Sequence, residues 1–332
     1  MSHIYVQYPK LREGCEFTHN NNHIVLNYRG DQFELYPENS VNIKEILTLL
    51  NQLDGSKSID ELEVLNKKNG FDNTLKLIQV LDESCLLYEG LKKVFTGKSG
   101  LEFIMELEDL NRIWDRKLGE TKLSRLFYEG ESSKELVIGW AFEYYHITKR
   151  AHDCITPAIA KGHGILRKKL IEFLHEEYRH DKLLLKSLTS LGFTEQEVID
   201  SIPTPYTAAL SNALAKWAHT DLLTFMAVLF IMEGTDLDGE EYMNALTHYE
   251  IDENFIRYQG VHGDINLEGD HGNVSREFYS IIDYISEEDQ LRVKKNLLMF
   301  QQMRVRQEEV FLDMYQENKR SHPYLFKNKV GI

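Results

Sequence analysis

The sequence predicts a mainly α-helical protein, a bundle of about seven helices that follows a small α+β domain. Helical periodicity runs from about residue 105 to about residue 320, whereas short β-type runs occur only in the first 95 residues. The chain has only 6 Pro among its 332 residues, so few positions force a long helix to end. We therefore expect the small domain over 1–95, a linker over 96–114 and the helical bundle over 115–325.

Within residues 1–95, strands and helices are expected in a definite order. The runs "HIVLNYRG" and "QFELYP" predict two strands, and "SVNIKEILTLLNQL" predicts an amphipathic helix that begins after a Ser or Asn cap. Two further helices are expected over "DGSKSIDELEVLNKK" and "FDNTLKLIQVLDES", and a strand over "CLLYEG". Strands, then three helices, then a strand indicate a winged-helix-like domain.

Glycine and proline mark the junctions that follow. Gly97 and Gly100 interrupt the pattern in "KKVFTGKSGLEFIMELEDLNR", which places the linker there. Two of the six Pro stand in "DSIPTPYTAAL", residues 200–210, and predict a loop between two helices of the bundle.

Composition limits the classes of function. The formal net charge is -15 at pH 7 and no long Lys/Arg-dense run occurs, which disfavours nucleic-acid binding. The N-terminus "MSHIYVQYPKLREG" lacks the layout of a signal peptide, and the longest apolar run, residues 222–232, is too short to cross a bilayer. We expect a cytoplasmic protein that binds neither membrane nor nucleic acid. Cys15, Cys85 and Cys154 have no C-x-x-C spacing, so any metal would be held by His and carboxylates.

Two helical segments carry Glu and His three residues apart. In "GWAFEYYHITKRAHD" these are Glu143 and His146, and in "LIEFLHEEYRHDKLLLKSL" they are Glu177 and His180, with Glu176 four residues before the same His. Residues three or four apart share a helix face, so each pair could chelate one ion or bridge two. The alternative for Glu143 and His146 is a structural role, as buried groups that bond to neighbouring helices.

Glu233 ends the apolar run "LLTFMAVLFIM". A helix that is apolar on every side is buried, and an ionised carboxylate there costs several kcal/mol unless a cation compensates it. Glu233 is therefore a candidate metal ligand. The alternatives are that it lies just past the buried part, in water, or pairs with an Arg.

The stretch "VHGDINLEGDHG", residues 261–272, is dense in possible ligands. A helix face can be marked by H-x-x-x-D-x-x-H, because offsets of four and seven residues return nearly to the same side. Asp264, Glu268 and His271 stand at these offsets, and His262 lies two residues before Asp264. Counted from His262, the middle position is Asn266. The alternative is a polar surface loop.

This spacing leaves a specific choice open. Either Asp264 takes the first position, or the helix bulges between Gly263 and Gly269 so that His262 reaches the site. Glu268 stands where the pattern has Asp, and two extra residues separate His262 from His271.

The four segments, taken in order, resemble the heme-oxygenase-like di-iron oxidases, also called iron-containing redox enzymes. The matching pieces are "AFEYYH", "LHEEYRHDKL", "FIMEG" and "HGDINLEGDHG", and the resemblance covers about residues 115–320. It implies a heme-oxygenase-like bundle, Fe(II) at about two ions per chain, and O2 as co-substrate. The metal ligands it implies are Glu177, His180, Glu233, His262, Glu268 and His271, with Glu176, Asp264, Asn266, Glu143 and His146 as alternatives. No catalytic residue beyond these ligands is implied.

The first ninety residues resemble the winged-helix, PqqD-like peptide-recognition elements of ribosomal-peptide modification enzymes. The best matching pieces are "LDGSKSIDEL" and the final "LDESCLLYE". In that family an extended leader peptide adds a strand to the small sheet of the domain. The alternative is a generic winged helix that serves dimerisation or binds nucleic acid.

Together the two resemblances predict an Fe-dependent, O2-activating oxidase or oxygenase. Its substrate would be a side chain or the backbone of a ribosomally synthesised precursor peptide, whose leader binds the N-terminal domain. One alternative is a di-iron oxidase that acts on a free amino acid or another small molecule. Another is a non-catalytic peptide-binding partner protein. The sequence leaves the oligomeric state open, with a homodimer among the options.

Overall fold

The computed structural model describes residues 4–20, 23–37, 42–90, 97–233, 236–268 and 271–318. The chain divides into two compact units, Met1–Ile113 with Ile282–Glu287, and Trp114–Ile281 with Glu288–Ile332. The chain passes from the first unit to the second within helix α4 (Gly100–Leu118). Most of the predicted linker therefore lies in a helix, while residue 96 is outside the described residues. The boundaries drawn from the sequence remain predictions.

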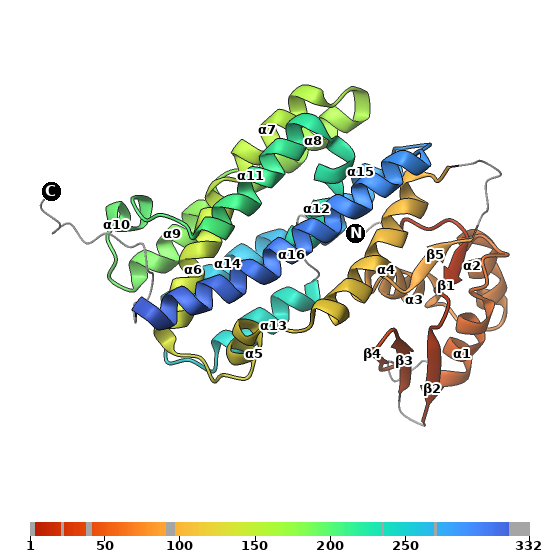
Figure 1. The fold of residues 1–332 in the computed structure, drawn as a ribbon. Coiled ribbons are helices and arrows are strands. Elements are labelled where there is room, and N and C mark those ends of the chain that lie inside the picture. The colour runs from red at the N-terminus through yellow and green to blue at the C-terminus, as the bar shows by residue number, and fades with distance from the viewer. Residues whose placement is uncertain are drawn as a thin grey trace, which may run out of the picture. The chain divides into compact units, whose positions relative to one another are not determined.

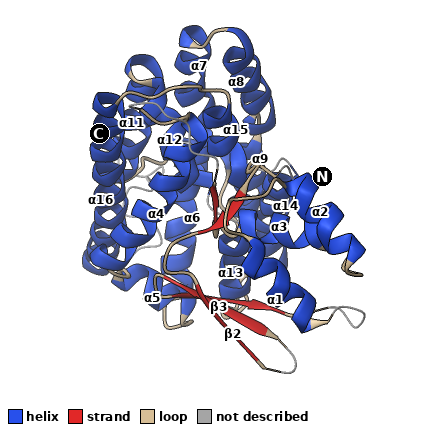
Figure 2. Cartoon of the chain, turned by 90° about the vertical axis from the view of Figure 1, so that its right-hand side faces the viewer, coloured by secondary structure: helices blue, strands red, loops and turns tan. Residues whose placement is uncertain are grey.

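In the described residues of the first unit, five short strands form two antiparallel sheets (Figure 2). One sheet pairs β1 (Pro9–Leu11) with β5 (Leu87–Glu89). The other has the order β2 (Glu16–His19), β3 (Ile24–Tyr28), β4 (Asp31–Leu35), with β3 in the centre. Leu26 of β3 stands opposite Phe17 and Phe33 and is fully buried, so this face of the sheet joins the apolar core.

Three helices complete the first unit, and their starts follow from capping chemistry. They are α1 (Ile43–Gln52), α2 (Ile59–Lys68) and α3 (Thr74–Glu83). Asn42 with Glu45 forms a capping box at α1, and Ser58 with Glu61 forms one at α2. The helices and the strands β3, β4 and β5 lie where the sequence predicts them, whereas β1 and β2 were not predicted. The winged-helix assignment stays a prediction.

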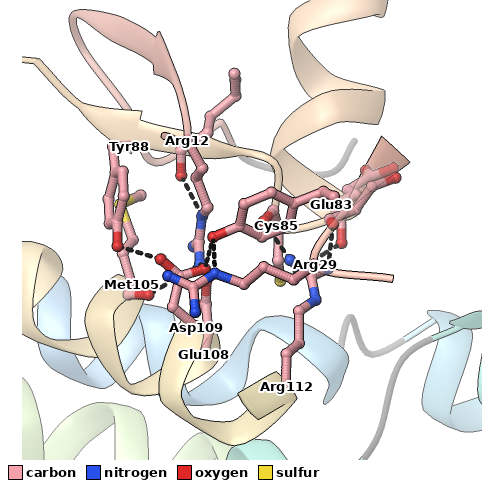
Figure 3. A network of polar contacts seen from close by, with 12 residues as sticks. Arg12, Arg29, Glu83, Cys85, Tyr88, Met105, Glu108, Asp109 and Arg112 are labelled. Atoms are coloured by element: carbon pink, nitrogen blue, oxygen red, sulfur yellow. Dashed lines mark hydrogen bonds and ion pairs between the residues drawn. The ribbon is translucent and has the colours of Figure 1, made fainter. Parts of the chain in front are cut away.

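A buried ion-pair network holds the strands of the first unit to α4 (Figure 3). The guanidinium of Arg12, which follows β1, donates to the carboxylates of Glu108 and Asp109 in α4. The hydroxyl groups of Tyr28 and Tyr88, from β3 and β5, also donate to Asp109. Arg12 is only 1% exposed. Breaking one member of such a buried pair costs about 3–5 kcal/mol, so this network is a principal tie within the first unit.

The second unit is helical (Figure 1). The helices that follow α4 are α5 (Lys122–Tyr128), α6 (Lys134–Lys149), α7 (Ala151–Lys161), α8 (Gly164–Glu177), α9 (His180–Ser190), α10 (Glu195–Ile199), α11 (Pro205–Thr220), α12 (Leu222–Glu233), α13 (Asp236–Leu246), α14 (Glu253–Glu268), the 3-10 helix η1 (His271–Asn273), α15 (Val274–Ser280) and α16 (Glu287–Asn318). Helix α9 packs along both α6 and α14, and α11 packs along α7.

The number of helices corrects the expectation of about seven. Twelve α-helices, α5 to α16, follow α4 in the described part of the chain. Several long periodic segments are interrupted by one or two residues, as at Arg150 between α6 and α7, Arg179 between α8 and α9, and Asp221 between α11 and α12. An interruption this short leaves the apolar periodicity on both sides intact, so the periodicity alone does not reveal it.

Helix α12 forms part of the core, as its apolar run predicts. Its residues from Thr224 to Leu229 are buried. Pro203 lies in the predicted loop, but Pro205 is the first residue of α11, a position that lacks a helical hydrogen bond in any case. In the described residues, no helix combines the length and the apolarity needed to span a membrane.

Candidate metal centre

Polar side chains from five helices of the second unit are linked, four of them by direct contacts and Glu233 by its electrostatic effect on Tyr144. The imidazole rings of His180, at the start of α9, and His262, in α14, have centroids 5.2 Å apart at an interplanar angle of 75°. Both are buried, with 4% exposure each. The other members are Tyr144 of α6, Glu177 at the end of α8 and Glu233 at the end of α12. We call these five residues the His-carboxylate cluster.

Glu177 and His180 stand on either side of a helix break. Glu177 is the last residue of α8 and His180 the first of α9, so the two do not lie on one continuous helix as their spacing predicts. Between them Arg179 adopts a left-handed conformation with φ 78°. The carboxylate Oε2 of Glu177 nevertheless lies 3.5 Å from Nδ1 of His180, with side-chain exposures of 8% and 5%. Left-handed backbone at a non-glycine residue is costly and concentrates at functional sites.

His262 reaches the cluster from an uninterrupted helix. Helix α14 continues as an α-helix to Glu268, so the bulge expected after Gly263 does not occur within the described residues, and Gly269 lies outside them. Phe255, Gln259 and His262 are buried and occupy one face of α14, because they are four and three residues apart. This face meets α9, where the amide Nε2 of Gln259 donates to Oγ of Ser187 at 3.1 Å. Helix packing, and not a bulge, brings His262 to His180.

Tyr144 is a member of the cluster that the sequence did not predict. Its hydroxyl oxygen lies 3.2 Å from Nδ1 of His262, and the two rings make an edge contact at 5.3 Å. Burial raises the pKa of Tyr144 well above its usual range, and Tyr242, Glu233 and Glu177 raise it further. Tyr144 is therefore a neutral phenol at neutral pH. No motif marks it, because its contact with His262 depends on how α6 packs beside α9 and α14.

Both carboxylates of the cluster act electrostatically on Tyr144. Glu177 and Glu233 lie close enough to disfavour a negative charge on the phenol oxygen. Glu233 is partly buried at the end of α12, so it lies at the edge of the apolar core. Glu233 is therefore linked to the cluster through its electrostatic effect on Tyr144.

Glu143 and His146 bond elsewhere. The carboxylate of Glu143 is fully buried and accepts hydrogen bonds from the backbone N–H and the hydroxyl of Thr204, at the start of α11. Nε2 of His146 lies 2.9 Å from Oγ of Ser201. These contacts agree with the structural alternative for both residues. The side chain of Glu176 is exposed on the solvent side of α8.

The remaining candidates lie in part outside the described structure. The backbone of Asp264, Asn266 and Glu268 belongs to α14, and that of His271 begins η1. Their side chains are outside the described residues, so their assignment as ligands stays a prediction. Among the side chains that are described, no three His, Cys, Asp or Glu are grouped closely enough to hold a metal ion. The donor types of the cluster, two imidazoles and two carboxylates, nevertheless fit Fe(II), which binds nitrogen and oxygen ligands.

Comparison with known proteins identifies the fold. The chain resembles a domain of unknown function with a heme oxygenase-like fold from Shewanella denitrificans OS217, at 18% identity and a TM-score of 0.56, over 66% of this chain and 96% of that one. It also resembles a TenA homologue from Pseudomonas syringae pv. tomato DC3000, at 12% identity and a TM-score of 0.52, over 67% and 100% of the two chains. These likenesses confirm the predicted heme-oxygenase-like fold of the helical part.

Comparison of the sequence identifies the family. No curated protein sequence matches the chain. A family model described as "Iron-containing redox enzyme" matches residues 138–303, which is half of the chain and contains the whole His-carboxylate cluster. The chain therefore belongs to the family of iron-containing redox enzymes.

Proposed function

We propose that the chain is a non-haem iron enzyme that uses O2 to oxidise a peptide. The observation that carries this proposal is that His180 lies against both His262 and the carboxylate of Glu177, side chains from three separate helices. A cation stabilises buried carboxylates, and one bound ion could serve side chains that come from three separate stretches of the sequence. Membership of the iron-containing redox family supports iron as that partner.

The proposed ligands are Glu177, His180, Glu233 and His262, joined by Glu268 and His271 for a second ion. Glu268 ends α14 and His271 begins η1, so both follow His262 within a short stretch of chain. Iron held by these nitrogen and oxygen ligands would supply the chemistry of dioxygen reduction. The surrounding side chains hold these ligands in place and keep the centre dry.

The burial of the cluster supports exclusion of water from the proposed iron centre. The rings of His180 and His262 are buried, and the residues of α12 from Thr224 to Leu229 are buried as well. The partly buried ring of Tyr144 makes an edge contact with His262 and another with the partly buried ring of Tyr242, at 6.4 Å. An enclosed, largely apolar site protects a reactive oxidant from side reactions.

The first unit is proposed to bind the leader of a precursor peptide. In the three-stranded sheet, β2 and β4 are the outer strands, and a peptide could extend the sheet at either one. Glu16 in β2 and Glu34 in β4 are exposed, which favours a leader with basic residues. Binding of the leader would raise the local concentration of the modified segment, so weak affinity at the iron centre would suffice.

Anaerobic iron loading of the full-length chain tests the enzyme. We expect about two Fe(II) per chain, consumption of O2 on mixing, and loss of both in the double variant His180→Ala/His262→Ala. His152, which is 58% exposed, provides the control, and His152→Ala should load iron like the wild type. A wild-type chain that binds no more iron than the double variant would refute an iron enzyme.

The substrate is tested with the iron-loaded chain, which is offered a short peptide encoded beside the gene and, separately, a free amino acid. Modification of the amino acid and not of the peptide would show that the substrate is a small molecule. Peptide binding without iron loading would instead indicate a non-catalytic peptide-binding partner.

A further inference from the structure

We propose that Tyr144 is a positioning residue that orients the imidazole of His262, so that Nε2 and not Nδ1 of this ring is presented to iron. The proposal rests on the proposed function, because it concerns a ligand of the same centre. It goes beyond that function by adding a residue that holds a ligand without being one. Three features of the second unit support it.

The first feature is the way in which the ring of His262 is held. The hydroxyl oxygen of Tyr144 lies 3.2 Å from Nδ1, and the Tyr144 ring meets the imidazole edge at 76°. The ring of His180 makes a second edge contact with the same imidazole, at 75°. Aromatic contacts at two sides and a polar contact at one nitrogen leave the ring little freedom to rotate. The polar contact determines which nitrogen faces the phenol.

The second feature is the hydrogen-bond chemistry of the pair. A neutral imidazole carries one proton, and a metal binds the nitrogen that does not carry it. If Nε2 is the ligand, the proton sits on Nδ1 and is donated to the phenol oxygen of Tyr144. A phenol oxygen can accept this bond while its own O–H remains a donor. Partners of this kind, beyond the ligands themselves, fix the tautomer and orientation of metal-binding His.

The third feature is that Tyr144 is itself held from the other side. The ring of Tyr242, from α13, makes an edge contact with it at 69°. The hydroxyl of Tyr242 lies 3.5 Å from Oε1 of Gln259, and Gln259 donates to Ser187 of α9. Gln259 is one turn before His262 on the same face of α14. The phenol and the imidazole that it orients are therefore fixed to the same helix.

Tyr144→Phe in the full-length chain tests the proposal, because it keeps the aromatic ring and removes only the hydroxyl. Tyr145→Phe is the matched control: Tyr145 is the next residue, is buried, and lies against His146 and Lys149. Fe(II) affinity is measured anaerobically by competition with a chelator. We expect Tyr144→Phe to weaken it by about 10- to 100-fold and Tyr145→Phe to leave it unchanged.

A second measurement reads the tautomer without metal. In chain labelled with 15N-histidine, long-range 1H–15N spectra should show the proton of His262 on Nδ1 in the wild type and on Nε2 in Tyr144→Phe. The His262 signal is identified by its absence from His262→Gln. Equal iron affinity of Tyr144→Phe and the wild type, equal losses in both Tyr variants, or an Nε2 proton in the wild type would each overturn the proposal. In those cases the wild type still loads iron, whereas a wild type that loads none refutes the proposed function as well.

Discussion

At the residue scale, Glu176 and Glu177 are neighbours with opposite surroundings. The side chain of Glu177 is 8% exposed and lies against His180, whereas that of Glu176 points to solvent at the same end of α8. Either could have been the ligand from the spacing alone. Because one side chain is buried and the other exposed, variants of Glu176 and Glu177 can test which of the two is the metal ligand.

The first prediction uses this pair. Glu177→Gln removes a carboxylate from the cluster and should lower Fe(II) affinity by about tenfold or more. Glu176→Gln changes an exposed residue and should leave the affinity at the wild-type level. The measurement is anaerobic chelator competition, with circular dichroism to show that both variants are folded. A larger loss in Glu176→Gln than in Glu177→Gln would make Glu176 the ligand.

A second prediction concerns Glu143, the buried carboxylate that bonds to Thr204 at the start of α11. Its oxygens accept the hydrogen bonds of Thr204, which is itself fully buried. Glu143→Ala leaves these donors without an acceptor and should lower the free energy of unfolding by about 1–3 kcal/mol. Glu143→Gln retains one acceptor oxygen and should lose less. Urea denaturation measures the difference, and a loss of iron affinity in the folded Gln variant would contradict a purely structural role.

At the scale of secondary structure, the break between α8 and α9 is the feature that shapes the cluster. Arg179 is held at φ 78°, a conformation that costs an L-residue about 1–2 kcal/mol. We predict that Arg179→Gly raises the thermal midpoint and keeps the Fe(II) affinity, because glycine adopts this conformation without strain. Arg179→Val should lower the midpoint, since a β-branched side chain tolerates it poorly. If both variants shift the midpoint in the same direction, the change in stability comes from the loss of the arginine side chain and not from the backbone conformation.

The start of α12 gives a prediction that depends on pH. Burial by itself would raise the pKa of Asp221, but its bonds with Arg292 and Thr224 outweigh burial and hold the pKa below the usual value. A carboxyl whose pKa is lower in the folded state contributes stability above its unfolded pKa, and this contribution is lost as the pH falls through the folded value. Asp221→Asn should therefore be less stable than the wild type at pH 7, with a difference that shrinks below about pH 4. Thermal unfolding across this pH range measures it, and a difference that is constant with pH would rule out the ion pair as its cause.

At the scale of the whole molecule, the chain combines a helical unit, which contains most of the region matched by the iron-containing redox family, with an α+β unit. Hydrogen exchange of the full-length chain tests the role proposed for the latter. A bound leader peptide should slow exchange in β2 or β4, where the outer strands would gain main-chain hydrogen bonds. The amides of β3 already pair on both sides and should change least. Protection confined to the second unit would show that the peptide is recognised there instead.

Much of this architecture could be predicted from local patterns. The strands over "IVLNY" and "DQFEL" and the capped helices after Asn42 and Ser58 follow from periodicity and capping, which act within a few residues. The same is true of α12, whose apolar run is buried from Thr224 to Leu229 and which ends at Glu233. Glu177, His180, Glu233 and His262 could be singled out because ligand-grade side chains recur there at helical spacing.

Tertiary structure alone decided how these residues meet. The left-handed Arg179, the face of α14 that carries His262 to α9, and the contact of Tyr144 with His262 have no counterpart in the sequence pattern. The physical reason is that periodicity records which side of a helix is buried, but not which neighbouring helix covers it. A one-residue break or the choice of packing partner is set by interactions between segments 30 to 120 residues apart along the chain, roughly the separations that join α6, α9, α12 and α14. Local patterns thus predict a mainly helical chain with candidate iron ligands, whereas the packing between helices brings His180, His262 and Tyr144 together.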